Sequence, residues 1–411
     1  VGFFVIFFSN ISFYFDESDG DILMDKYLDK IGCFESVSLI STLTLLRFYP
    51  ATGPCFEKSF NHFISLIQNP VAGATTCAVL HYFDSVFVGS FYHKYFDWKP
   101  YIPSIFNAIS NSLVSTVKVL GDDLRAGNAQ GFSLPIGVVG GFDDDCVVIY
   151  ASSFISTLFA EYEEEKGQEQ TISKLALSTL KDFVSAFIPM ITPKSKKVDN
   201  VVVFISGVIR KFISYAHLID TLKRKDPEAV KNISIGDETR TQFVDIVLPF
   251  VQSALFNGKA HVQNEIIRCV SCLAELSYQK TIDALVPFCL NNMVDPEMTA
   301  TSRVCFTVIK YLIPTMLKED HIEENFSRIP QIIEASLERC KNTLLKNYFL
   351  GMSVLSEIAQ FISIPAEKEL NSKLSIKQRM VANAMINSLE TVIKCHFDHN
   401  KPLTTDQADN P

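Results

Sequence analysis

Cysteine, histidine, aspartate and lysine residues form a few short sets that could do chemistry in this chain. Cys269 and Cys272 are its one Cys-x-x-Cys pair, and such a pair can bind zinc or undergo redox exchange. A zinc site needs a second pair at a suitable spacing, and a redox site needs a strand before the first cysteine. Neither is found, and the apolar spacing of a helix continues through both residues. We therefore interpret them as core cysteines.

A second set of possible metal ligands lies near the end of the chain, at Cys395, His396, Asp398 and His399. Adjacent residues on a helix point in different directions. One ion could not bind all four side chains unless the helix unwound. The set therefore does not predict a metal site.

Two further segments have residue types that bind ligands in other proteins. Residues 137–141 read Gly-Val-Val-Gly-Gly, but they lack the Gly-Lys-Ser/Thr ending of a phosphate loop and a flanking strand. They are most simply a flexible turn. Residues 143–145 are three aspartates, and acids at a helix start commonly interact with its free amides and its dipole. With no Ser/His/Asp or Cys/His set either, the sequence predicts a protein that is not an enzyme and requires no cofactor or metal.

Two basic clusters are the best candidate site. The candidate residues are Lys194, Lys196, Lys197, Lys223, Arg224 and Lys225. Both clusters follow predicted helices, so we expect them to share one edge of a helical array. A solvated rim is the simpler interpretation, because charged residues are common in turns. The alternative is an anion site for a polyphosphate or an acidic partner segment. Unchanged affinity for inositol polyphosphates after replacement of all six by Ala would exclude it.

Apolar spacing predicts four consecutive helices between residues 241 and 317. Each has a stripe of apolar residues three or four apart. The stripes are Phe243, Ile246, Val247, Phe250, Val251 and Ala254; Val262, Ile266, Cys269, Val270, Leu273 and Leu276; Ile282, Leu285, Val286, Cys289, Leu290 and Met293; and Val304, Val308, Tyr311 and Leu312, with Ile309 and Ile313 beside them. Asn257-Gly258 ends the first helix, and Asp295-Pro296-Glu297 starts the fourth. Short links between antiparallel helices predict an all-α fold, an α-solenoid of HEAT or armadillo type.

The same spacing predicts helices along the rest of the chain. They cover residues 22–31, 36–48, 57–67, 75–91, a segment opened by residues 98–103, and then 145–162, 172–191, 201–222, 322–340, 344–364 and 374–397. The predicted organisation is an apolar segment of unassigned structure (1–20), HEAT-like helix pairs (21–120), a glycine-rich loop (121–145), further helix pairs (146–397) and a polar tail (398–411). A repeat of about 40 residues matches a HEAT unit.

Composition also favours a helical array and narrows the class of partner. Stacked helices that bury two faces can absorb a hydrophobic content of 47% in a chain of 411 residues, which exceeds the usual size of one core. No uninterrupted apolar run of about 18 residues predicts a membrane span. The net charge of −9 argues against general nucleic-acid binding, and ten scattered cysteines suit a reducing compartment. We therefore expect a protein of the nucleus and cytoplasm, with neither a membrane nor a nucleic acid as direct partner.

Residues 1–8 are apolar, and the chain does not begin with Met. They lack the leading basic region and the small-residue cleavage site of a signal peptide. We expect a cut through a longer protein or an inaccurate gene start, with a helix or strand whose packing partners lie upstream.

Four short segments, taken in order, are similar to segments of one known family. They are Phe48-Tyr49-Pro50 before an apolar helix, Gly141-Phe142-Asp143-Asp144-Asp145 followed by Phe154-Ile155-Ser156-Thr157-Leu158-Phe159, Asp182-Phe183-Val184 with Phe187, and Leu285-Val286-Pro287-Phe288-Cys289. Through them the chain resembles the large HEAT-repeat proteasome activators, the family of the yeast bleomycin-sensitivity protein and its animal homologue. The resemblance is discontinuous and extends from residue 48 to residue 364.

The resemblance implies one section of a longer solenoid that caps the end ring of α subunits of the proteasome core particle. Members of the family open the gate without ATP and promote the degradation of peptides and unfolded proteins, with roles in DNA repair and in the turnover of acetylated histones. They also have basic openings that hold inositol polyphosphates, which makes such a ligand possible here without assigning its residues.

The end of the chain departs from the family pattern. Family members have Tyr as the next-to-last residue, whereas this chain ends Asp409-Asn410-Pro411. We therefore expect either that the true C-terminus is missing or that this section cannot open the gate alone. The alternative function is another HEAT-repeat scaffold, above all a nuclear transport receptor whose acidic inner surface would accept basic cargo.

Overall fold

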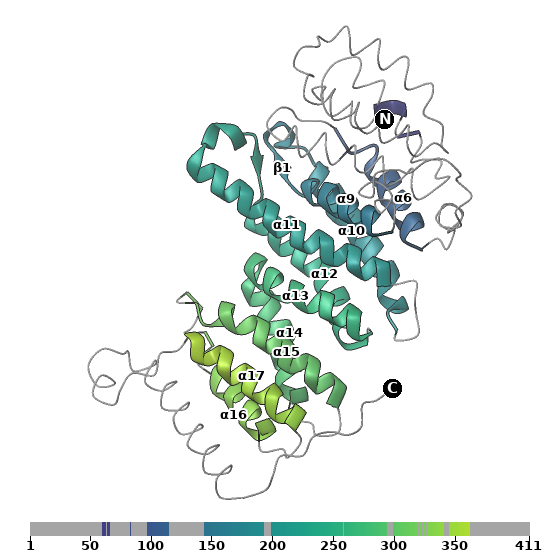
Figure 1. Ribbon diagram of the computed structural model, residues 1–411. Helices are drawn as coiled ribbons and strands as arrows, with labels where there is room; N and C mark the ends of the chain where they lie inside the picture. Colours follow the sequence, from purple (N-terminus) through teal and green to yellow (C-terminus); the bar gives the residue numbers. More distant parts are fainter. Residues whose placement is uncertain are drawn as a thin grey trace, which may run out of the picture. The chain divides into compact units, whose positions relative to one another are not determined.

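The computed structural model describes residues 60–62, 64, 65, 83, 97–114, 144–192, 199–257, 259–293, 299–318, 320, 321, 324, 325, 327–340 and 345–361. These residues are mostly helical, as the apolar spacing predicts (Figure 1). The chain divides into two compact units, Val1–Phe250 and Val251–Pro411. The predictions for residues 1–48, 121–143 and 362–411 lie outside the described residues.

The first unit is built around two helices that pack along each other, α9 and α11. Its helices are α6 (Ile102–Val114), α9 (Asp144–Thr157), η3 (Glu163–Glu165), α10 (Ile172–Phe187), η4 (Ile188–Met190), α11 (Asp199–Lys225), η5 (Pro227–Val230) and the first part of α12 (Asp237–Asn257). Helix α6 contacts α9, α10 and α11. The helices predicted after residue 98, at 172–191 and at 201–222 are confirmed with small changes at their ends.

Aromatic side chains fill much of the core of the first unit. Trp98, the one tryptophan of the chain, is buried. Its ring centroid lies 5.3 Å from that of Phe60, 5.4 Å from Phe83 and 5.0 Å from Phe154 on α9. All three contacts are edge-on, the geometry that the quadrupoles of aromatic rings favour. This cluster joins α9 to the turn that precedes α6.

A short pair of strands interrupts the helices of the first unit. Strand β1 (Glu161–Tyr162) pairs with β2 (Ile233–Ser234) in antiparallel register. The prediction that a helix continues to residue 162 is therefore wrong, since α9 ends at Thr157. The Thr157 hydroxyl donates a 2.7 Å hydrogen bond to the carbonyl of Phe154, and such side-chain bonds compete with the helical pattern of the backbone.

Helix α11 has 27 residues and, among the described helices, is the one that is long and apolar enough to cross a membrane by length and composition. However, 67% of its most apolar window is buried inside the protein. A core helix passes the same test, because burial on several sides requires apolar residues all round. Packing along α9 therefore accounts for this composition.

The second unit is a succession of helices that contact their neighbours in order. It contains the end of α12, then α13 (Ala260–Leu276), α14 (Tyr278–Met293), α15 (Thr299–Met316), α16 (Arg328–Cys340) and α17 (Leu345–Phe361). Along the sequence, α13 contacts α14, α14 contacts α15, and α16 contacts α17. Every second helix is also in contact, α13 with α15, α15 with α17, and α14 with α16. These contacts order the helices in two rows, α13–α15–α17 and α14–α16.

The predicted apolar stripes agree with the observed burial in most positions. All six stripe residues of α13 are buried. Ile246 on α12 and Leu290 on α14 are half-exposed. The prediction is wrong for Tyr311 on α15, whose side chain is 41% exposed. The helix start predicted at residues 295–297 lies outside the described residues.

Helix α16 begins later than the sequence predicts, at Arg328 instead of residue 322. The delay follows from Asn325, which is buried and takes part in a loop. Its side-chain amide donates hydrogen bonds to the carbonyls of Met316 and His321, at 3.1 and 2.8 Å. Its backbone carbonyl accepts from the backbone amides of Arg328 and Ile329, both at 2.9 Å. Asn325 thus holds the preceding loop with its side chain and receives the first amides of the helix with its backbone, which fixes where α16 starts.

Candidate functional site

One of the two predicted basic clusters, at Lys223, Arg224 and Lys225, lies in the last turn of α11 instead of the turn after it. All three side chains are exposed. Nε of Arg224 donates to the carbonyl of Asp220 at 3.2 Å, and the carboxylate of Asp220 pairs with Arg240 at 2.7 Å. Cations in the last turn interact favourably with the negative end of the helix dipole. The cluster therefore has a structural explanation that needs no ligand.

The other cluster, Lys194, Lys196 and Lys197, lies outside the described residues. It precedes α11 in the sequence, whereas the second cluster ends that helix. At 1.5 Å per residue, the 27 residues of α11 span about 40 Å. The expectation that both clusters share one edge stays a prediction, but one small anion that touches both would have to bridge most of the length of a helix.

The described half of the candidate site does not fit an inositol polyphosphate well. An anion is stabilised by the free amides and positive dipole at a helix N-terminus, while the C-terminal end presents carbonyls and negative partial charge. Lys223, Arg224 and Lys225 surround a C-terminal end, and the exposed carboxylate of Asp226 follows them directly. These three residues thus offer exposed cations without the help of a helix N-terminus, and an anion site that includes them stays a prediction.

The remaining sequence candidates are placed only in part. Cys269 is buried and Cys272 is half-buried on α13. Their thiols contact carbonyls of their own helix, Glu265 at 3.6 Å and Arg268 at 3.8 Å. In the described part of the chain, no group of three or more His, Cys, Asp and Glu residues is arranged to hold a metal ion. The glycine-rich segment 137–141 and the ligand set at 395–399 lie outside the described residues.

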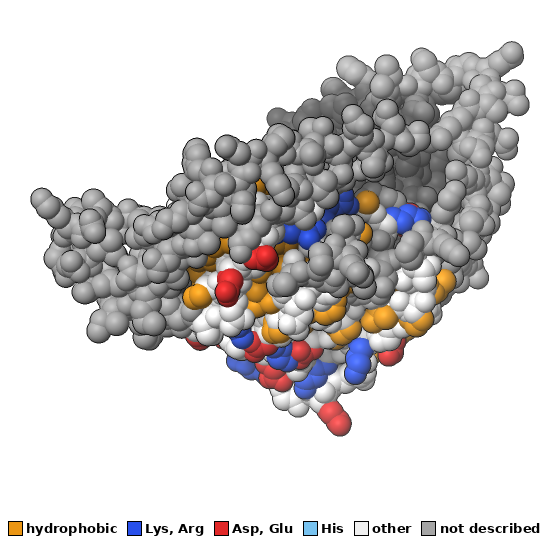
Figure 2. Space-filling model, turned by 90° about the horizontal axis from the view of Figure 1, so that it is seen from below, with side chains coloured by type: hydrophobic (Ala, Val, Ile, Leu, Met, Phe, Trp, Pro, Cys, Tyr) orange, Lys and Arg blue, Asp and Glu red, His pale blue; other side chains and the backbone are white. Residues whose placement is uncertain are grey.

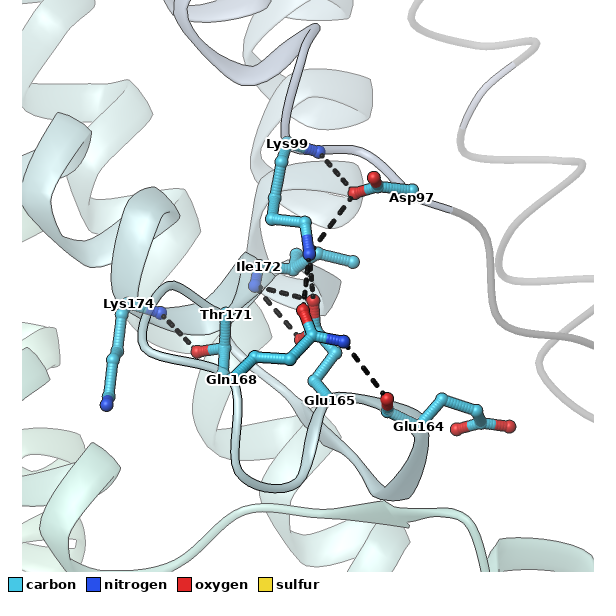
Figure 3. Close-up of polar contacts among 8 residues, drawn as sticks. All are labelled: Asp97, Lys99, Glu164, Glu165, Gln168, Thr171, Ile172 and Lys174. Atoms are coloured by element: carbon cyan, nitrogen blue, oxygen red, sulfur yellow. Dashed lines mark hydrogen bonds and ion pairs between the residues drawn. The ribbon is translucent and has the colours of Figure 1, made fainter.

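The most completely bonded polar group of the first unit surrounds Glu165, in η3 (Figure 3). This carboxylate is buried, with an exposed fraction of 1%. Both of its oxygens lie 3.0 Å from the backbone nitrogen of Ile172, at the start of α10. Oε1 also lies 3.2 Å from Nζ of Lys99, which comes from the turn before α6. Glu165 therefore joins three segments of the fold.

Lys99 and Thr171 complete this group, which we call the Glu165 clamp. Nζ of Lys99 donates to Oε1 of Gln168 at 2.8 Å and lies 3.7 Å from a carboxylate oxygen of Asp97. Oγ1 of Thr171 caps α10 by accepting from the backbone amide of Lys174 at 3.2 Å. In Figure 3 the Lys99 chain extends from its turn toward Glu165 and Gln168.

The chemistry of the Glu165 clamp is structural. A general acid or base must reach a reacting group, but Glu165 is buried and its oxygens are engaged by the Ile172 amide and Lys99. A carboxylate at the first turn of a helix stabilises the free amides and the positive end of the dipole. The clamp thus fixes the start of α10 against the turn before α6.

Sequence reasoning missed Glu165, because this residue is one of several glutamates, Glu161 and Glu163 to Glu165, around the end of the helix predicted at residues 145–162. One signal could have separated it from its neighbours. Gly167 has φ of +84°, a conformation that favours glycine and turns the chain back. Thr171 then supplies an N-cap residue type, so a turn and a helix start follow closely after Glu165.

A second polar cluster holds the loop between α15 and α16 in the second unit. The rings of Tyr278 and His321 stack with centroids 3.6 Å apart and planes 2° from parallel. Asn325 donates from its amide to the Tyr278 hydroxyl. Arg328 pairs with Asp283 on α14 at 2.6 Å. Burial raises the pKa of the Tyr278 hydroxyl, so the site makes this phenol a weaker acid and does not activate it.

The exposed surface carries charges of both signs. Figure 2 shows one face, on which basic and acidic side chains lie among hydrophobic ones. No protein-family model matches this chain, and no curated protein matches it either. The fold and the polar groups thus define a mostly helical protein whose most completely bonded polar groups hold its helices together.

Proposed function

We propose that this chain is a non-catalytic, HEAT-like solenoid section of an ATP-independent proteasome activator that caps the core particle. The observation that supports the solenoid is the two-row succession of α13 to α17, in which each helix contacts its second neighbour and, except for α15 and α16, the next helix as well. Repeats of a solenoid bury their apolar faces against the repeats on either side in this way. Such proteins act through extended surfaces. This agrees with the two polar clusters around Glu165 and Asn325, whose side chains bond to other parts of the fold and hold helices in place.

The particular partner rests on the four segments that resemble the activator family. The best of them is residues 141–145 followed by residues 154–159. Its second part includes the end of α9 and continues beyond it, and Phe154, Ile155, Leu158 and Phe159 are all buried there. The similarity therefore concerns residues that build a helical repeat. By the same resemblance, the proposed partner is the ring of α subunits of the core particle, with acetylated histones among the substrates and nucleus and cytoplasm as the location.

Co-sedimentation with purified core particles, without ATP, tests the proposal. We expect the chain to sediment with core particles and to be displaced when another activator occupies both end rings. A version with a C-terminal tail whose next-to-last residue is Tyr should also raise hydrolysis of a fluorogenic peptide. Binding to the GTP-loaded transport GTPase, without binding to core particles, would replace the proposal with a nuclear transport receptor.

A further inference from the structure

Helix α15 has one open face, although it contacts α13, α14 and α17. Most of its apolar residues are buried. The residues that stay at least partly exposed from residue 303 onward are Arg303, Thr307, Lys310, Tyr311, Pro314 and, two residues after the helix ends, Lys318. We call this set the α15 stripe. From residue 299 to residue 318 the chain has three cationic residues and no Asp or Glu, and acids follow only from Glu319.

The α15 stripe is a continuous surface. At 100° per residue, the positions from Arg303 to Pro314 fall within an arc of about 100°. Arg303 and Lys310 are separated by about 10 Å along the axis, and Lys318 follows two residues after the helix ends. Tyr311, 41% exposed, lies at the edge of this arc opposite Lys310. An aromatic ring and three cations thus line one face over about 20 Å.

The cations of the α15 stripe are not used within the described part of the protein. There, none of Arg303, Lys310 and Lys318 forms an ion pair or a side-chain hydrogen bond, whereas Lys99, Arg240 and Arg328 all pair with carboxylates. The chain as a whole has nine more acidic than basic residues. Two cations on α15 and a third just after it, with no acid between residues 299 and 318, are therefore a local exception, and they need no rearrangement to meet a negative ligand.

We propose that the α15 stripe binds an acidic segment of a partner polypeptide in an extended conformation. An extended chain advances about 3.3 Å per residue, so cations about 10 Å apart match acids about three residues apart. Carboxylates would pair with Arg303, Lys310 and Lys318, and an apolar or aromatic side chain of the partner would pack on Tyr311. This inference needs only the exposed face of α15 and does not rest on the proposed proteasome partner.

A nucleic acid fits this surface less well than an acidic peptide. One strand carries a phosphate about every 3.4 Å, so about six phosphates would lie along the stripe against three cations. The net charge of −9 would also repel a long polyanion beyond the stripe. A peptide with an acid at every third position presents three charges over the same length.

Fluorescence anisotropy with the 411-residue chain tests the inference. The probe is a fluorescein-labelled peptide of about ten residues with three glutamates spaced three apart and one phenylalanine. At about 3.3 Å per residue, the three glutamates span about 20 Å, which matches the stripe. Its control has glutamines in place of the glutamates. The stripe variant combines Arg303→Gln, Lys310→Gln and Lys318→Gln. The matched variant combines Lys174→Gln, Lys181→Gln and Lys211→Gln, which removes the same charge from exposed positions on α10 and α11.

We expect the stripe variant to bind the acidic peptide at least about tenfold more weakly, a loss of about 1.4 kcal/mol, and the matched variant to stay within about twofold of the wild type. The glutamine peptide should lose binding to a similar extent, and added salt should weaken the wild-type complex. Tyr311→Ala should weaken binding about threefold. Melting curves of all variants should coincide, because the altered residues are at the surface.

Two results would overturn the inference. Equal losses in the two triple variants would show general charge attraction instead of a site on α15. Tighter binding of a single-stranded nucleic acid probe that the stripe variant also loses would show a nucleic-acid surface. The peptide assay does not involve core particles. If it contradicts the inference about α15, co-sedimentation with core particles still tests the proposed function separately.

Discussion

Among single residues, Glu165 is the polar side chain on which the first unit depends most directly. Its buried carboxylate accepts from the Ile172 amide and pairs with Lys99. Glu165→Gln would place an amide group against these donors and remove the buried carboxylate that lies 3.2 Å from the Lys99 ammonium. Removing one partner of a buried pair is costly, so we expect a loss of about 2 to 3 kcal/mol in the free energy of unfolding, measured by urea denaturation followed by circular dichroism.

Glu164→Gln is the matched control for that change. Glu164 stands next to Glu165 in the same short helix η3, but its side chain is exposed. We expect a change within about 0.5 kcal/mol, as for surface substitutions in general. Equal losses for the two variants would contradict the role given to the buried carboxylate, because only the net charge of η3 would then matter.

Cys340 gives the structure a defined pH dependence. Its side chain is 3% exposed, and burial raises the pKa of its thiol from 9.0 to about 11. The folded pKa is above the unfolded one, so the contribution to stability is complete below about pH 9 and is lost as the pH rises toward 11. Two pKa units correspond to about 2.7 kcal/mol. Between about pH 8 and about pH 10.5, the unfolding free energy of the wild type should therefore fall by about 2 kcal/mol more than that of Cys340→Ala. Equal falls in the two proteins would contradict the raised pKa of the Cys340 thiol.

Among the helices, the contact between α16 and α17 depends on Gly351. A Cβ at this position would lie 2.4 Å from the carbonyl oxygen of Ser336 and 2.6 Å from Sγ of Cys340. A backbone oxygen cannot move away cheaply, so Gly351→Ala should cost about 2 to 3 kcal/mol in spite of the better helix propensity of alanine. Thermal melting checks this.

Gly236→Ala is the control for Gly351→Ala. Its added Cβ would lie 3.4 Å from the nearest atom, which belongs to the side chain of Glu161. We expect a change within about 0.5 kcal/mol, since this contact is ordinary and the side chain can move. If both alanine variants melt at the same temperature, the close approach of α16 and α17 does not cause the loss of stability in Gly351→Ala.

The helices also show what sequence spacing can predict. The stripe of α13 is buried in full, because helical periodicity is a local property of the sequence. Tyr311 has the same spacing on α15 and is exposed, because its burial depends on which neighbours cover the helix. The Glu165 clamp joins Lys99 to a residue 66 positions away, and β1 pairs with β2 although α10 and α11 lie between them in the sequence. No periodicity within one element contains that information.

At the scale of the whole molecule, the stability of each helix can depend either on its contacts with neighbouring helices or on the folding of the entire chain. In a linear array each repeat contacts only adjacent repeats, so stability is a sum of local terms. In one cooperative globule, any destabilising change weakens the protection of backbone amides against hydrogen exchange throughout the chain. From α13 to α17 the contacts of the second unit join second neighbours and most next neighbours, which is the pattern that a linear array would require.

Hydrogen exchange on two destabilised variants separates these cases. Gly351→Ala should speed exchange of backbone amides in α16 and α17, which the substitution disturbs directly, and leave α9 and α11 at the wild-type rate. Glu165→Gln should do the reverse, with faster exchange in α10 and its neighbours and no change in α17. Local opening explains both exchange patterns, because the amides of a helix lose protection against exchange when the contacts of that helix weaken. Uniformly faster exchange in both variants would contradict a linear array and, with it, the solenoid on which the proposed function depends.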